Sequence, residues 1–239
     1  MKLVPLARAF FDRPVLAVAR DLIGQLLVRT MAAGDAVVVC VGRIAEAEAY
    51  AGRVDPASHS FRGPTPRTRT MFGPVGHAYV YFTYGNHFCV NVVAGPRPLA
   101  GAVLLRAIEP QLGVQAMRAE RARRTRAGDL RRKLADGRAD HELASGPGKL
   151  TAALAIDRTL DGIDITQRGL LYLAQGDPAA DVLWTPRVGL GTNPAAPWRW
   201  RCIDARSPHV TRVPAAWPRA PRPSPSLAQV ARACFTGGR

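Results

Sequence analysis

The segment Tyr79-Val-Tyr-Phe-Thr-Tyr-Gly-Asn-His-Phe-Cys-Val-Asn91 predicts a β-hairpin. Two runs of strand-forming residues flank Thr83-Tyr84-Gly85-Asn86, and the Gly and Asn of this turn tolerate positive φ angles. Side chains alternate across a strand, so Tyr79 and Tyr81 lie on one face of the hairpin. Tyr84 is left at the tip.

A large aromatic side chain at a hairpin tip has no protein interior to enter. In a strongly basic chain, Tyr84 can instead act as a wedge in a stack of nucleic-acid bases, and Tyr81 behind it can serve as a stacking platform for one base. Packing in the protein core is the alternative that this segment leaves open for Tyr79 and Tyr81.

Composition predicts a single domain over residues 1–213, followed by a flexible basic tail rich in Pro, Ala and Arg over residues 214–239. The chain of 239 residues is 47% hydrophobic, enough for one substantial core. Its net charge is +15 and its pI is near 11.0. This balance favours a polyanion as partner, although an Arg-rich composition without such a partner stays open.

Several classes are disfavoured. The sequence has no apolar run long enough to span a membrane and no secretory signal, so we expect a cytoplasmic, nucleoid-associated monomer without membrane contact. The cysteines lack the spacing of a metal site or a disulfide framework, and Cys40 and Cys89 lie in apolar runs typical of buried thiols. The four cysteines are Cys40, Cys89, Cys202 and Cys234.

The N-terminal part predicts one helix and two strands. Asp12 is a candidate N-cap, with Pro14 in the first turn and Gly24 closing the helix. Strands follow at residues 25–30 and 37–50, separated by a Gly34-Asp35 turn. Alternation places four side chains on one face of the second strand: Ile44, Glu46, Glu48 and Tyr50.

Two carboxylates within apolar sequence indicate either a functional role or a solvent-exposed face of an edge strand. Glu46 and Glu48 would lie about 7 Å apart along the strand and would repel each other unless an arginine lies between them. Arg43 and Arg106 are the candidates for that arginine. The loop over residues 51–74 that follows is long and basic, which favours a functional role, and His59 either lines a site there or caps a turn.

Eight blocks, in order, resemble the alkyladenine (3-methyladenine) DNA glycosylase family, and the similarity covers roughly residues 8–212. The blocks are Glu46 to Tyr50, His59-Ser60, Thr65 to Arg69 with Met71-Phe72, Tyr79 to Gly85, Cys89 to Asn91, Leu104 to Pro110, Ser145 to Leu150 and Arg187 to Gly191. The loop after His59 is one residue shorter than the family pattern, and Pro64 stands where an arginine is expected.

The resemblance implies roles for individual residues. Glu48 matches the residue that activates water, with Arg106 and the backbone of Val188 holding that water. Tyr84 matches the residue inserted into the duplex. The residues that match the base pocket are Tyr50, His59, Tyr81 and Asn91, of which Asn91 disfavours the amino group of normal guanine. The residues expected at the DNA backbone are Arg62, Arg67, Arg69 and Lys149, the last just before a predicted helix.

The implied activity is that of a monofunctional DNA glycosylase acting on alkylated or deaminated purines in double-stranded DNA, with no cofactor or metal. A lyase activity would need an amine nucleophile, and Lys2, Lys133 and Lys149 lie outside the aromatic cluster. The alternative is a non-catalytic basic DNA- or RNA-binding protein. A carboxylate at the position of Glu48 favours catalysis, because it would only repel phosphate in a binding module.

The remaining patterns predict an α/β fold of the α+β type. Strands are expected at residues 100–107, 170–174, 187–190 and 198–203, and helices at 111–126 and 150–156. Segregated helices and consecutive strands indicate a single domain with a curved, mostly antiparallel sheet, flanking helices and a protruding hairpin.

Overall fold

The structure is a computed structural model that describes residues 2–125, 128–137 and 140–230. Its strands are β1 Leu26–Ala33, β2 Ala36–Tyr50, β3 Ala78–Thr83, β4 His87–Val93, β5 Ala102–Leu112, β6 Leu171–Ala174, β7 Val182–Thr185 and β8 Arg201–Asp204. Its α-helices are α1 Val15–Leu22, α2 Val114–Arg123, α3 Gly128–Ala135 and α4 Pro147–Ala153.

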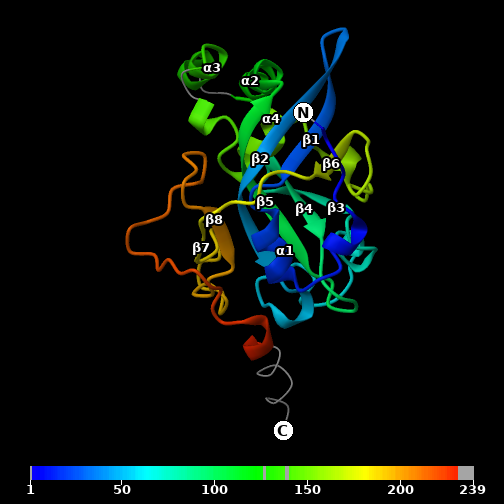
Figure 1. Ribbon diagram of the computed structural model, residues 1–239, viewed down its shortest axis with the longest axis vertical. Helices are drawn as coiled ribbons and strands as arrows, with labels where there is room; N and C mark the ends of the chain where they lie inside the picture. The colour runs from blue at the N-terminus through cyan, green and yellow to red at the C-terminus, as the bar shows by residue number, and fades with distance from the viewer. Residues whose placement is uncertain (1, 126–127, 138–139, 231–239) are drawn as a thin grey trace.

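All strands pair antiparallel in one open sheet with the order β3-β4-β5-β2-β1-β6, and β8 branches from β2 to pair with β7. Figure 1 shows α1 in the lower half of the molecule and α2 with α3 at the top, beside the long β1–β2 hairpin. The single α+β domain expected from the sequence is thus confirmed. Among the described residues, no helix has both the length and the apolar content to cross a membrane.

Helix α1 packs its apolar side on the sheet, as its spacing predicts. Val18 and Leu22 are completely buried, and α1 contacts β2 and β5. The start of the helix differs from the prediction. Pro14 occupies the N-cap position, and no side chain caps the helix there, so Asp12 is not the cap.

A β-bulge interrupts the alternation of β2. Its pairing with β5 shifts between Ile44 and Glu46 and again between Glu46 and Ala47. Because one extra residue reverses which face the next side chain occupies, Ile44 packs in the same apolar core as Ala47 and Ala49. The prediction that Ile44 shares a face with the two glutamates is therefore wrong, whereas Glu46 and Glu48 do lie together.

Strand β5 is longer than predicted and runs through Glu109-Pro110, where a helix was expected to begin. Pro110 pairs with Gly42 next to a register shift, a position that tolerates a residue without a backbone N–H. Helix α2 therefore begins only at Val114. The strand predicted over residues 187–190 is also wrong, because this segment is a turn after β7.

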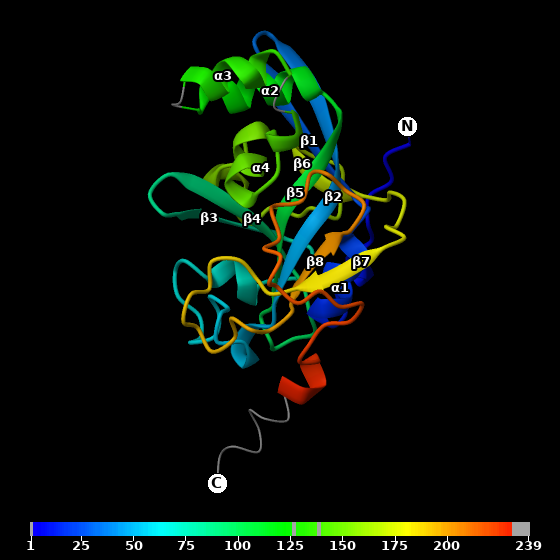
Figure 2. The ribbon, with the colours of Figure 1, turned by 90° about the vertical axis from the view of Figure 1, so that its left-hand side faces the viewer.

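The β3–β4 hairpin forms as predicted and projects from the sheet (Figure 2). The backbone N–H of Asn86 donates to the Thr83 carbonyl at 3.2 Å, which closes the turn. The positive φ angles fall on Tyr84 (50°) and Gly85 (67°), and Asn86 does not share them. Positive φ is uncommon for a bulky residue, and here it fixes Tyr84 at the tip with 80% of its surface exposed.

The segment after residue 213 packs on the domain as far as the structure describes it. Trp184 and Ala220 form an isolated β-bridge, the Trp200 indole donates to the Pro225 carbonyl at 2.7 Å, and Val230 belongs to the apolar core. The last nine residues of the segment expected to be a flexible tail, 231–239, lie outside the described residues. So does Cys234, while Cys40, Cys89 and Cys202 are buried free thiols.

Candidate active site

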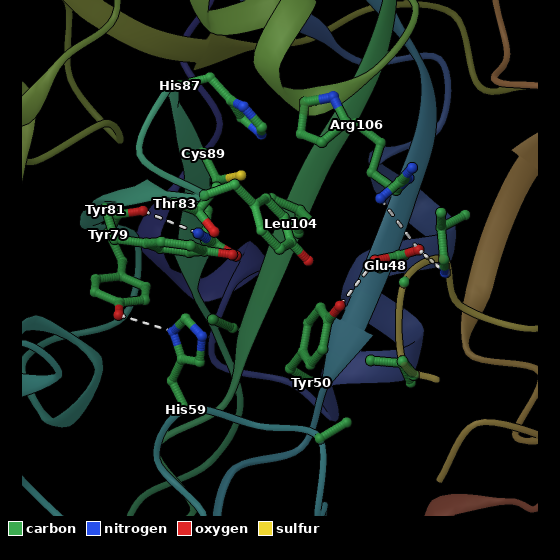
Figure 3. A pocket seen from close by; sticks show the side chains of 18 of the residues that line it. Glu48, Tyr50, His59, Tyr79, Tyr81, Thr83, His87, Cys89, Leu104 and Arg106 are labelled. Atoms are coloured by element: carbon green, nitrogen blue, oxygen red, sulfur yellow. Dashed lines mark hydrogen bonds and ion pairs between the residues drawn. The ribbon is translucent and has the colours of Figure 1, made fainter. Parts of the chain in front are cut away.

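A cavity of about 330 Å³ opens between the β3–β4 hairpin and strands β2 and β5. This volume is within the range of small-molecule sites. Figure 3 shows His59, Tyr79 and Tyr81 on one side of the cavity and Glu48, Tyr50 and Arg106 on the other. The sequence-predicted residues that line it are Glu48, Tyr50, His59, Tyr81, Tyr84, Asn91, Arg106 and Val188.

Glu48 is completely buried on β2 and is held by three neighbours. The Val188 backbone N–H donates to Glu48 Oε1 at 2.8 Å, and Arg106 Nη1 lies 3.4 Å from the same oxygen. The Tyr50 hydroxyl donates to Glu48 Oε2 at 2.8 Å. These contacts fix the carboxylate at the cavity surface and hold its negative charge beside a guanidinium.

Arg106 lies between the two glutamates of β2. Its Nε donates to Glu46 Oε1 at 2.5 Å, while its Nη1 faces Glu48. Burial alone would lower the pKa of Arg106, but the charges of the two glutamates outweigh it and raise the pKa above its ordinary value. Arg106 is therefore the intervening arginine. Arg43, the other candidate, pairs instead with Glu109 and Asp204.

Glu46 lies one step behind the cavity and does not line it. Besides Arg106, it accepts from Arg201 Nε at 2.7 Å and from the Thr211 backbone N–H at 2.7 Å. Burial alone would raise the pKa of Glu46, but Arg106, Arg201 and Thr211 together lower it. The two predicted carboxylates thus differ in surroundings: Glu48 faces the cavity, and Glu46 anchors two buried arginines.

The Tyr50 ring forms one side of the cavity and is supported from behind by Arg187. The Arg187 guanidinium carbon lies 4.7 Å from the centre of the Tyr50 ring and 5.2 Å from that of Trp200. The Asp55 carboxylate accepts two hydrogen bonds from Arg187, at 2.6 and 2.9 Å, and both residues are completely buried. Burial, with the charge of Glu48, raises the pKa of Tyr50 well above its ordinary value, so its hydroxyl stays a donor.

His59, Tyr79 and Tyr81 form the opposite side, here called the aromatic wall. The Tyr79 hydroxyl and His59 Nδ1 are 3.0 Å apart, and the His59 ring meets the Tyr81 ring edge-to-face at 4.6 Å between centroids. Desolvation of the ring, followed by the charge of Arg67, lowers the pKa of His59, so this imidazole is neutral at pH 7. A neutral imidazole can both donate and accept a hydrogen bond.

Asn91 and Cys89 contribute the part of the cavity formed by β4. Asn91 is buried, and its Nδ2 donates to the Tyr79 carbonyl at 3.0 Å, which fixes the orientation of its amide. Tyr84 reaches the cavity from the hairpin tip, and a Cβ placed on Gly189 would lie 3.7 Å from the Tyr84 hydroxyl oxygen. The hairpin tip and the turn that carries Val188 therefore approach each other at the cavity mouth.

The arginines and the lysine predicted at the DNA backbone do not behave alike. Arg62 and Arg69 are exposed on the loop that follows His59. Arg67 reaches toward the aromatic wall, with its guanidinium carbon 5.3 Å from the Tyr81 ring centre. Lys149 pairs with Glu142 at 2.9 Å and lines a neighbouring groove with Arg121 and Arg124. Pro64 is exposed on the same loop as Arg62.

Sequence reasoning missed the residues that support the site from outside. Asp55 lies in the loop after β2, and Arg201 and Thr211 lie more than 150 residues from Glu46 in the chain. Arg187 stands in a block that also contains Val188, and an arginine in apolar sequence is the signal that could have suggested a buried ion pair. Its partner has no comparable local signal.

Comparisons with known proteins agree on one family. The family model described as methylpurine-DNA glycosylase (MPG) matches residues 9–206. A Burkholderia lata protein is 46% identical over 198 residues, covering 82% of this chain and 86% of the relative. Relatives from Carboxydothermus hydrogenoformans and Streptomyces avermitilis are each 44% identical, over 82% and 91% of this chain and 93% and 96% of their own lengths. All three carry the name "Putative 3-methyladenine DNA glycosylase". Together with the order of its sequence blocks, these matches establish that the chain belongs to the methylpurine-DNA glycosylase family.

Proposed function

We propose that this protein is a monofunctional base-excision-repair DNA glycosylase that flips alkylated or deaminated purines out of duplex DNA and hydrolyses their N-glycosidic bond. The observation that carries the proposal is the position of Glu48. Its buried carboxylate faces a cavity that has aromatic rings on both sides, and its charge is held by Arg106 and the Val188 N–H. In this role the protein acts as a monomer on nucleoid DNA in the cytoplasm.

The proposed reaction uses these residues at defined atoms. A base in the stack is out of reach, so the nucleotide turns into the cavity while Tyr84 fills the space that it leaves. The flipped base stacks between Tyr50 and Tyr81. Glu48 accepts a proton from a water molecule whose oxygen forms a bond to C1′. The electrons of the glycosidic bond leave with the purine, which gives free base and an abasic site.

The remaining cavity residues position the flipped nucleotide and select which bases are accepted. His59 hydrogen-bonds near the sugar edge of the flipped nucleotide, and the amide of Asn91, fixed by the Tyr79 carbonyl, opposes the amino group of normal guanine. The rival function, a non-catalytic DNA- or RNA-binding protein, explains the basic surface equally well. It gives no reason for a carboxylate buried at the surface of a cavity, where it would repel phosphate.

The deciding experiment is single-turnover release of free base from duplexes that contain 3-methyladenine, 7-methylguanine, hypoxanthine or ethenoadenine, with the products resolved. We expect release of damaged purines and DNA strands that stay intact until alkali is added. Glu109→Gln is the matched control for Glu48→Gln, because Glu109 is a glutamate on β5 outside the cavity. Binding without any base release would favour the rival function, and strand cleavage without alkali would contradict the monofunctional assignment.

A further inference from the structure

Both aromatic rings between which the base is proposed to stack have an arginine against them. Arg187 lies against Tyr50 at 4.7 Å, and Arg67 lies against Tyr81 at 5.3 Å. Both tyrosines line the cavity, and neither arginine does. Each of these cavity-lining rings therefore has a guanidinium next to it that does not itself line the cavity.

The two arginines differ in how their charge is balanced. Arg187 is completely buried and forms two hydrogen bonds with the Asp55 carboxylate, so the pair carries no net charge. Arg67 is exposed, and within the described part of the chain no carboxylate lies within ion-pair distance of it. Its Nη2 donates to the backbone carbonyl of Phe82 at 3.3 Å, a partner that carries no charge. The positive charge next to Tyr81 is therefore uncompensated.

The charge of Arg67 acts on the groups of the aromatic wall. It is one of the causes that lower the pKa of His59, after desolvation. Burial raises the pKa of Tyr79 to about 12, and Arg67 opposes that rise. A cation on one face of a ring also uses part of the attraction that the ring offers to a second cation on the other face. Both effects disfavour positive charge in the cavity.

We propose that Arg67 is a specificity-determining residue whose uncompensated charge behind Tyr81 biases the cavity toward uncharged damaged purines and against purine cations. The proposal rests on the proposed function, because it concerns the base that enters the same cavity. It separates two kinds of damage by chemistry. Deaminated and etheno purines are neutral, whereas purines alkylated at N3 or N7 carry a positive charge before they leave the sugar.

The test compares wild type, Arg67→Met and Arg67→Lys on duplexes of one sequence that contain 7-methylguanine, hypoxanthine or ethenoadenine. The rate constant of single-turnover base release and the duplex affinity are both measured. For each variant, the value for the cationic lesion is divided by the value for a neutral lesion, and this ratio is compared with that of wild type. The ratio cancels the intrinsic lability of each base and any general change in DNA affinity. Arg69→Met is the matched control, because Arg69 is an exposed arginine of the same loop that does not line the cavity.

We expect Arg67→Met to raise the ratio of cationic to neutral lesion by roughly three- to tenfold, the size that a single charge at this distance supplies across a protein surface. Arg67→Lys keeps the charge and should stay near wild type, and Arg69→Met should leave the ratio unchanged. Equal losses on all lesions would assign Arg67 a structural or phosphate-binding role and overturn the proposal. Equal shifts of the ratio in Arg67→Met and Arg67→Lys would also overturn the proposal, because they would show that the shape of the arginine side chain matters and not its charge.

The same experiment distinguishes failure of the glycosylase proposal from failure of the proposed role of Arg67. If wild type releases no base from any duplex, the glycosylase proposal fails, and the affinity ratio still decides whether Arg67 disfavours a cationic base. If wild type releases base but the ratio does not move in Arg67→Met, the glycosylase proposal stands and the role of Arg67 is refuted.

Discussion

The Tyr50 hydroxyl donates a hydrogen bond to Glu48 Oε2 at 2.8 Å, so the ring proposed to stack on the base is joined to the carboxylate proposed to activate water. The two residues are two positions apart on β2 and therefore point to the same side of the sheet. A single strand therefore positions both the ring and the carboxylate.

Glu48→Gln should reduce base release by about 10²-fold or more, because an amide cannot accept the proton of the attacking water. Affinity for lesion duplex should stay the same or rise, since a negative charge near phosphate is removed. Single-turnover release and duplex affinity measure the two effects, with Glu109→Gln as control. A Glu48→Gln enzyme with wild-type turnover would overturn the mechanism.

Glu46→Gln should retain measurable turnover but lose stability, by about 3 kcal/mol, because Arg106 and Arg201 would lose a buried partner. The pKa of Glu46 is lowered in the folded state. Its contribution is therefore fully present above the unfolded pKa of about 4.3 and is lost as the pH falls through the lower folded pKa.

The Tm difference between wild type and Glu46→Gln should accordingly be constant from pH 6 to 8 and shrink in acid below about pH 4. Thermal unfolding across this range checks it. A difference that grows in acid would mean that the ionised form of Glu46 is not the stabilising one.

Tyr84→Ala should lose more activity on a lesion in duplex DNA than on the same lesion in a single strand, because only the duplex needs its stack filled. A stacking aromatic is worth about 1–3 kcal/mol, so the additional loss should be roughly tenfold or more. Phe82→Ala is the control, since Phe82 is also exposed on the hairpin but packs on Phe88 away from the cavity. Equal losses on both substrates would identify Tyr84 as a packing residue.

Asp55→Asn should destabilise the protein by about 3–5 kcal/mol, because it leaves the Arg187 guanidinium buried without a counter-charge. It should also weaken base release, since Arg187 supports the Tyr50 ring. Asp21→Asn is the control: the Arg13–Asp21 ion pair is about one-third exposed and should be worth less than about 1 kcal/mol. Denaturant unfolding of both variants measures the difference, and equal effects would contradict the buried-pair argument.

The logarithm of the binding constant for undamaged duplex should fall linearly with the logarithm of the salt concentration, with a slope of about 0.9 per phosphate contact. Replacing Arg62 or Arg69 with Met should reduce that slope by about 1 each if these exposed side chains neutralise phosphates. Arg20→Met, on the exposed side of α1, should leave the slope unchanged. An affinity that does not change between 50 and 200 mM salt would contradict the hypothesis that these arginines bind DNA phosphates.

Local sequence patterns were sufficient to predict the features that depend on neighbouring residues. Turn chemistry and the two-residue period of a strand were enough to predict the β3–β4 hairpin, the exposed Tyr84 and the common face of Tyr79 and Tyr81. The same local patterns located α1 and the Gly34-Asp35 turn. The order of the blocks predicted the family, which the comparisons establish.

Contacts between groups far apart in the chain could not be predicted, because they depend on the tertiary structure. The bulge that separates Ile44 from Glu46, the pairing that extends β5 past Pro110, and the choice of Arg106 over Arg43 all depend on strands brought together from separate parts of the chain. The same holds for Asp55 with Arg187 and for Arg67 with Tyr81. A buried charge must find a partner, but the sequence shows only the charge, because the partner is fixed by how the loops close in space.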